Sequence, residues 1–219
     1  MKCTDKEWQH CRVEKMGCPG CHYDETKEKI FYIFLDIDGV LNNMEYWNEC
    51  FARHQVNGIM SMNCFPFDPK CLNNLMKLNQ KLQKQNYNVK IILSSTWRLN
   101  QIDIGIVNSR LAEYGMRIFA TTISLSSGKR GLEIKNFLED EQYGKANNYF
   151  ILDDEIKDIV EQFEEIHIIN TNFNTGFDNE KLEEAMRKLN SFEKKGVNYD
   201  KGRKRSNKIF RTDKTRLFK

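Results

Sequence analysis

The stretch Ile30-Phe-Tyr-Ile-Phe-Leu35, followed directly by Asp36-Ile-Asp-Gly-Val40, decides the fold class of this chain. A short continuous apolar run of this kind is typical of a strand that is buried on both faces. The chain repeats the pattern at residues 89–93 and 149–152, and we expect two further strands at 117–120 and 166–169.

Stretches with helical periodicity separate these apolar runs. Asp68-Pro69 is typical of a helix start, with Asp as N-cap and Pro in the first helical position. Further helices are predicted around residues 104–114, 132–138 and 182–189. The alternation predicts an α/β fold, a Rossmann-like parallel sheet with helices on both faces, which binds ligands beyond the carboxyl ends of its strands.

Composition divides the 219 residues into three regions. Residues 1–28 are polar and rich in cysteine, 29–192 hold the α/β pattern, and 193–219 form a basic tail. From Lys194 onward, eleven Lys/Arg against two Asp/Glu give a net charge of +9, whereas the whole chain carries +3. The remainder is therefore mildly acidic, and the tail is expected to attract polyanions such as nucleic acid.

Neither a membrane span nor a signal segment is expected from the sequence. No apolar run approaches the roughly 20 residues that cross a bilayer, and the N-terminus is polar. Seven cysteines, an odd number, favour reduced or metal-bound thiols over a disulfide scaffold. We therefore expect a cytoplasmic protein without a membrane partner, and the sequence leaves its oligomeric state open.

Acidic pairs follow two of the predicted strands. Asp36 and Asp38 follow the first, and Asp153 and Asp154 end the third strong one. Residues two apart in an extended chain project to the same side, so Asp36 and Asp38 are expected to face the crevice together. Carboxylates that close repel unless a cation joins them, and Mg²⁺ prefers oxygen ligands. These four aspartates are the predicted metal ligands.

Hydroxyl and basic side chains occupy other positions near this edge. Ser94 and Ser95 end the second strand, where hydroxyls and turn amides can hold phosphate oxygens, although a serine there often only caps the next turn. Lys129 and Arg130 precede a helix, where a cation could neutralise both a phosphoryl group and a nucleophile. The alternative for such a cation is plain solvation.

Taken in this order, the motifs resemble the four motifs of the haloacid dehalogenase-like (HAD) superfamily of phosphatases and phosphotransferases. They are most similar to the phosphatase-like domain of Swiss army knife RNA-repair proteins. The resemblance covers about residues 30–190. It rests on the segments 35–42, 93–98, 130–134, 151–154 and 175–177.

The resemblance implies a covalent mechanism. Asp36 would attack phosphorus to form an aspartyl-phosphate, and Asp38 would protonate the leaving oxygen and then activate water. Mg²⁺ would bind Asp36, the main-chain carbonyl of Asp38, and Asp153 or Asp154.

The remaining roles are also implied by position. Ser94 and Arg130, or alternatively Lys129, would hold phosphoryl oxygens. Trp97 and Arg98 are candidate substrate contacts, because an aromatic face and a guanidinium suit a base and a phosphate, although Trp more often packs. Residues 42–67 stand where the superfamily has a flap or small cap. Their small number and apolar character predict a packed segment and an open site that admits a polynucleotide end.

Cys18-Pro-Gly-Cys21, with Cys11 and His22 nearby, could form a tetrahedral zinc site, although unpartnered cysteines are common. Cys50, Cys64 and Cys71 are expected to be structural. The predicted function is a Mg²⁺-dependent phosphatase acting on a phosphorylated nucleotide or nucleic-acid end. The alternatives are a small-metabolite phosphatase and a non-catalytic nucleic-acid-binding protein.

Overall fold

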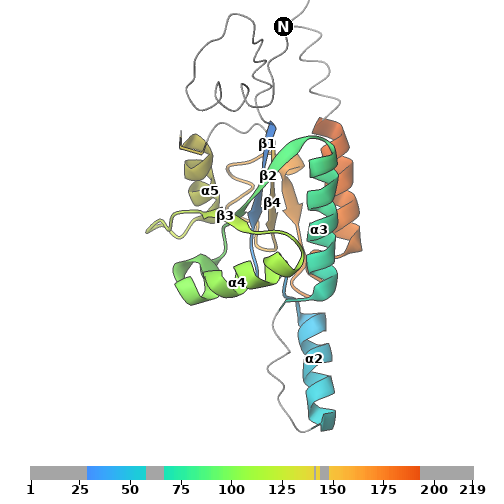
Figure 1. Cartoon of the computed structure of the whole chain (residues 1–219). Helices are drawn as coiled ribbons and strands as arrows, with labels where there is room; N and C mark the ends of the chain where they lie inside the picture. Colours follow the sequence, from blue (N-terminus) through green and yellow to red (C-terminus); the bar gives the residue numbers. More distant parts are fainter. Residues whose placement is uncertain (1–28, 58–66, 141, 144–147, 193–219) are drawn as a thin grey trace, which may run out of the picture.

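Five parallel strands form one sheet in the computed structural model, which describes residues 29–57, 67–140, 142–143 and 148–192. The strand order is β3-β2-β1-β4-β5, with β1 at the centre (Figure 1). The strands are β1 Lys29–Leu35, β2 Tyr87–Leu93, β3 Ile118–Thr121, β4 Tyr149–Asp153 and β5 Ile168–Asn170. This confirms the predicted α/β fold with a parallel sheet.

The helices alternate with the strands along the chain, and all of the longer ones except the first were predicted. They are α2 Met44–Asn57, α3 Pro69–Lys84, α4 Gln101–Glu113, α5 Arg130–Glu139 and a helix over residues 179–192, with short 3₁₀ helices η1 Thr96–Leu99 and η2 Glu165–His167. Helix α3 begins at the predicted cap: the side chain of Asp68 accepts a hydrogen bond of 2.8 Å from the Lys70 N–H. Pro69 lacks an N–H and therefore costs nothing in this first turn.

Helices cover both faces of the sheet, as Figure 1 shows with α5 on one side and α3 on the other. Along β1, Phe31, Ile33 and Leu35 pack in one core cluster with apolar residues of α3, α4 and the 179–192 helix. Tyr32 and Phe34 point to the opposite face and pack with α5. From Phe31 to Leu35 both faces of β1 are fully buried, which explains why this sequence is a continuous apolar run instead of an alternating one.

The strand register brings polar residues to one level at the carboxyl edge. Leu35 of β1 is paired with Leu93 of β2 and Leu152 of β4. The next residues in the three strands are Asp36, Ser94 and Asp153. The order of strands changes direction between β1 and β4, and such a switch point opens a crevice for ligands beyond the strand ends.

Helix α2 is the described part of the expected cap, and it extends away from the sheet (Figure 1). The loop at 172–176 holds its first turn: the N–H groups of Met44 and Glu45 donate to the carbonyls of Phe173 and Asn174, at 3.1 and 3.0 Å. Phe67, where the chain enters α3, is buried as expected. The apolar residues expected to pack the middle of the segment, Met60, Met62 and Phe65, lie outside the described residues.

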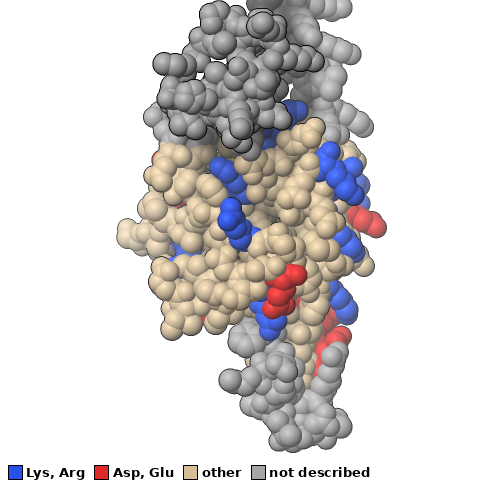
Figure 2. Space-filling view, in the orientation of Figure 1, with Lys and Arg blue, Asp and Glu red and all other residues tan. Residues whose placement is uncertain are grey.

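Two sequence predictions cannot be placed in the fold. The zinc candidates Cys11, Cys18, Cys21 and His22 and the basic tail lie outside the described residues. Within the described part of the chain, no helix has the length and apolar character needed to cross a bilayer. On the face in Figure 2, the Lys and Arg side chains of the described part are spread out and do not form one patch.

Candidate active site

Three carboxylates meet where β1 and β4 end. One oxygen each from Asp36, Asp153 and Asp154 lies within 4.8 Å of the others, and no fourth metal-ligating side chain joins this group among the described residues. Asp36 and Asp153 are buried, and Asp154 is partly exposed. Adjacent parallel strands that end at the same level therefore bring together the two acidic segments predicted from the sequence.

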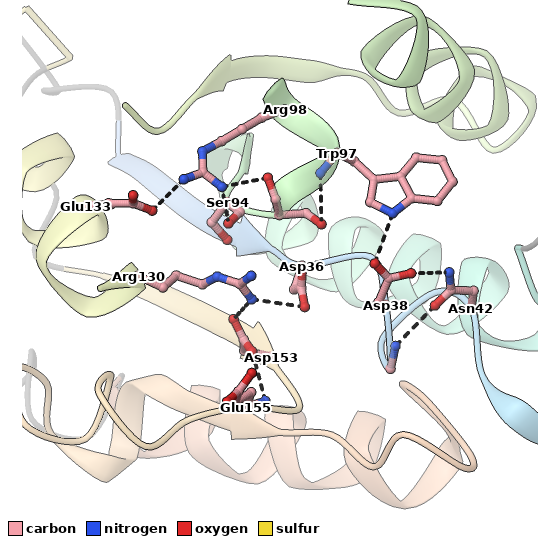
Figure 3. A network of polar contacts seen from close by, with 12 residues as sticks. Asp36, Asp38, Asn42, Ser94, Trp97, Arg98, Arg130, Glu133, Asp153 and Glu155 are labelled. Carbon is pink, nitrogen blue, oxygen red and sulfur yellow. Dashed lines mark hydrogen bonds and ion pairs between the residues drawn. The ribbon is translucent and has the colours of Figure 1, made fainter. Parts of the chain in front are cut away.

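Arg130 lies between two of these carboxylates, as Figure 3 shows. Its Nη1 is 3.0 Å from Asp36 Oδ2 and 2.5 Å from Asp153 Oδ2. The first turn of α5 is held in place by Asp158, whose carboxylate accepts a 2.7 Å hydrogen bond from the Gly131 N–H. Gly131 is required there because a Cβ would lie 2.5 Å from the carbonyl oxygen of Asp158.

One guanidinium does not neutralise the cluster. Burial raises the pKa of Asp153 to about 7; Arg130 opposes the shift and Asp36 adds to it. The pKa of Asp154 is raised too, by burial and then by Asp36. For Arg130, burial alone would lower the pKa, but Asp153 and Asp36 outweigh it and raise the pKa. These directions describe carboxylates that are partly desolvated and lie close to another negative charge.

Ser94 lies beside Asp36 on the neighbouring strand, because its N–H continues the ladder with a 3.0 Å hydrogen bond to the Leu35 carbonyl. Its side chain is completely buried, and its Oγ has no hydrogen-bond partner among the described residues. Buried hydroxyls are normally paired, so this one is available to a bound group. Ser95 instead caps η1: its Oγ accepts a 3.4 Å hydrogen bond from the Trp97 N–H.

Asp38 lies apart from the three-carboxylate cluster. Its Oδ1 accepts a 2.6 Å hydrogen bond from Asn42 Nδ2, and its Oδ2 accepts a 3.0 Å hydrogen bond from Trp97 Nε1 (Figure 3). Asp38 was also among the predicted metal ligands, but its side chain is not one of the clustered carboxylates. The alternation of an extended strand stops at Leu35, and Gly39 at φ +68° turns the chain.

The guanidinium of Arg98, a candidate substrate contact, forms its hydrogen bonds with other groups of the protein. Its Nη2 is 2.5 Å from Glu133 Oε2, and its Nη1 donates to the carbonyls of Ser94 and Ser95, at 3.1 and 2.7 Å. The two charged side chains are only 6% and 3% exposed. Arg98 therefore ties the end of β2 to α5 and holds the backbone around Ser94.

Lys129 and Trp97 are also placed clearly. Lys129 is half-exposed and pairs with Glu161 at 3.6 Å, on the outside of α5, whereas the neighbouring Arg130 points into the cluster. The Trp97 ring packs edge-on against Phe67, with 5.5 Å between ring centroids. Trp97 thus combines packing with the hydrogen bond to Asp38.

Residues 32–182, well over half of the chain, match the family described as the HAD domain in Swiss Army Knife RNA repair proteins. The chain belongs to this family. This confirms the suspected resemblance, and it indicates a hydrolase with the HAD-type α/β fold. The chain matches no curated protein and no solved structure.

The family implies a divalent metal ion, and the residues of this HAD domain fit one. The three clustered side chains offer only carboxylate oxygens, which are the ligands that a hard cation such as Mg²⁺ prefers. The pKa values of Asp153 and Asp154 are raised by burial and then by the neighbouring Asp36, and a bound cation would oppose both effects by favouring the charged carboxylates. Both aspartates of the pair reach the cluster, so the structure does not reduce the predicted ligand set to one of them.

Sequence reasoning assigned no role to three residues that hold this HAD domain's site together. Asn42 fixes Asp38, Glu133 neutralises Arg98, and Asp158 caps α5. Asn42 and Glu133 lie within the segments 35–42 and 130–134 that carry the family resemblance, but the resemblance did not indicate their partners. The partners of Glu133 and Asp158 lie 35 and 27 residues away in the chain, and no local pattern identifies such pairs.

Proposed function

We propose that this HAD domain is a Mg²⁺-dependent phosphatase that works through an aspartyl-phosphate on Asp36. The observation that carries the proposal is that the four aspartates have two different environments. Asp36 sits with Asp153 and Asp154 in a group suited to a cation, and Asp38 stands outside it, held by two hydrogen bonds. A nucleophile and a separate acid are what phosphate-ester hydrolysis through a covalent intermediate needs.

In the first step, an oxygen of Asp36 attacks phosphorus, and the bond from phosphorus to the leaving oxygen breaks. Asp38 delivers a proton to that oxygen, so the alcohol departs neutral. In the second step, Asp38 takes a proton from a water molecule that attacks the aspartyl-phosphate. Inorganic phosphate leaves, and both aspartates return to their starting states.

Two groups of the chain are suited to the phosphoryl oxygens. The unpaired Oγ of Ser94 lies at the level of Asp36 and can donate one hydrogen bond. Arg130 uses Nη1 for both carboxylates, and a guanidinium has further N–H donors for an anionic oxygen. Lys129, which faces Glu161, is less suited to this role.

The metal ligands in this proposal are Asp36, the main-chain carbonyl of Asp38, and Asp153 or Asp154. When bound there, Mg²⁺ would offset charge on the transferring phosphoryl group. The chain's own contribution is to keep these oxygens together. Strand pairing fixes Asp36 against β4, through a 3.0 Å hydrogen bond from its N–H to the Leu152 carbonyl.

For the substrate we propose a phosphorylated nucleotide or nucleic-acid end. Two features support this class: the matched family is named for RNA repair proteins, and the tail has a net charge of +9. A small phosphorylated metabolite is the competing substrate class.

The test is phosphate release from an aryl phosphate, a sugar phosphate, nucleoside monophosphates, and oligonucleotides phosphorylated at either end. Each substrate is run with Mg²⁺, with EDTA, and with the Asp36→Asn variant. The proposal expects release that needs Mg²⁺ and disappears in the variant, with nucleotides or oligonucleotides preferred. Equal release by variant and wild type would refute the role of Asp36, and a preference for sugar phosphates would refute the substrate class.

A further inference from the structure

A pocket of about 370 Å³ opens beside Asp38, and none of the three clustered aspartates is in its lining. It is lined by Asp38, Asn42, Asn43, Met44, Trp47 and Phe173. The side chains of Trp47 and Phe173 are 54% and 52% exposed, which is high for large apolar groups. Exposed apolar side chains that gather around one hollow mark binding sites more often than inert surface.

The backbone segments that carry the two aromatic walls of this pocket are tied together. Trp47 is on α2 and Phe173 is on the 172–176 loop, and the N–H of Met44 donates a 3.1 Å hydrogen bond to the Phe173 carbonyl. The loop is itself tied to the turn after β1, because the Phe177 N–H donates to the Val40 carbonyl at 2.8 Å. Preformed walls lose little freedom when a ring binds between them.

The pocket lies where the leaving group must go. In the proposed mechanism, Asp38 protonates the leaving oxygen, so the rest of the substrate extends from Asp38 away from Asp36. Asp38 lines the pocket and Asp36 does not. The group attached to the leaving oxygen therefore meets Met44, Trp47 and Phe173 first.

We infer that this pocket binds the nucleobase next to the scissile phosphate, with its ring against Trp47 and Phe173. The inference rests on the proposed phosphatase function. It adds which part of the nucleotide substrate this pocket would bind. Among the described residues that line the pocket, Asp38 is the only charged one, so this part of the lining offers no cation to an anionic leaving group. A neutral aromatic ring suits apolar walls, and stacking on such side chains accepts any base.

The experiment compares adenosine 5′-monophosphate with ribose 5-phosphate, which has the same phosphoester but no base. Wild type is expected to show a kcat/KM for the nucleotide at least about tenfold higher, as base stacking typically gives. The Trp47→Ala variant brings the ratio close to one, and Trp47→Phe restores much of it. Phe51→Ala is the matched control: Phe51 is one helical turn further along α2 and 53% exposed, but it does not line the pocket.

Direct binding separates this inference from the phosphatase proposal. Adenosine, which has no phosphate to hydrolyse, is titrated into wild type, Trp47→Ala and Phe51→Ala by calorimetry. Loss of binding only in Trp47→Ala supports the pocket even if no phosphate is ever released. The inference is overturned if hydrolysis occurs but the nucleotide has no advantage over the sugar phosphate. It is also overturned if adenosine binds all three proteins equally or none of them, or if sedimentation shows that Trp47 is covered in a dimer that Trp47→Ala dissociates.

Discussion

The indole Nε1 of Trp97 donates a 3.0 Å hydrogen bond to Oδ2 of Asp38, across 59 residues of sequence. The second oxygen of Asp38 is held by Asn42, so both oxygens of the proposed acid have a fixed direction. Trp97 follows β2 and Asp38 follows β1. The pair therefore connects the ends of two neighbouring strands at the place where the leaving group is expected.

Replacing Trp97 with Phe removes the hydrogen bond and keeps an aromatic ring against Phe67. General acid catalysis contributes about 10²–10⁴-fold, and we expect loss of orientation to remove about tenfold of this in kcat for an alkyl phosphate, whose leaving oxygen needs a proton. An activated aryl phosphate, whose leaving group needs none, should lose much less. Equal losses on both substrates, measured on protein with unchanged thermal stability, would contradict the positioning role.

Mg²⁺ should stabilise the protein through the carboxylate cluster. A ligand that binds only the folded state adds about 2.7 kcal/mol to the free energy of unfolding at a hundredfold excess over Kd. Thermal melts with Mg²⁺ and with EDTA should therefore differ for wild type, and the difference should shrink in Asp36→Asn and Asp153→Asn. Glu161→Gln is the control. Glu161 is eight residues after Asp153 in the sequence, but it is not part of the carboxylate cluster and pairs with Lys129. A Mg²⁺ response that survives in Asp153→Asn would remove Asp153 from the site.

The Arg98–Glu133 pair is expected to matter for stability. Glu133→Gln leaves a buried guanidinium without its counter-charge, which costs about 3–5 kcal/mol in buried pairs. The surface pair Arg110–Glu113, with side chains 31% and 54% exposed, is the comparison, and Glu113→Gln should cost about 1 kcal/mol or less. Urea unfolding measures both. Similar costs for the two variants would mean that the Arg98–Glu133 contact contributes no more than a surface ion pair.

Cys71 should be protonated and unreactive at neutral pH. Burial, followed by the negative charge of Asp68, raises the pKa of its thiol to about 12. Because the folded state disfavours the thiolate, this contribution to stability is complete below the unfolded pKa of about 8.5 and is lost as pH rises from there toward 12. Alkylation of the Cys71 peptide, followed by mass spectrometry at pH 8, should be much slower in native than in urea-unfolded protein. Equal rates would contradict the buried environment.

Much of the fold could be predicted from local patterns. The apolar run before Asp36 predicted β1, and Asp68-Pro69 predicted the start of α3 to the residue. The meeting of Asp36 and Asp153 also followed from sequence, because parallel strands end at one edge. These features depend on periodicity and capping, which are determined by residues close together in the sequence.

The side-chain partners could not be predicted in the same way. The direction of Asp38 depends on where β1 stops and on a turn at Gly39, and element ends are the least predictable part of a fold. Arg98 looked available for a phosphate until the structure placed Glu133 against it. Such contacts depend on how α5 packs on the sheet. This packing cannot be read from the sequence of any one segment.

The central claim is that Asp36 carries the phosphoryl group and that Asp38 handles protons. The most direct test is Asp38→Asn with 4-nitrophenyl phosphate and Mg²⁺. This substrate's leaving group needs no protonation, so Asp36 should still be phosphorylated, but the water in the second step loses its base. The account predicts a burst of one equivalent of nitrophenol, very slow turnover afterwards, and a phosphate on the acid-quenched peptide that contains Asp36. Normal steady turnover, or a burst without phosphate on that peptide, would contradict it.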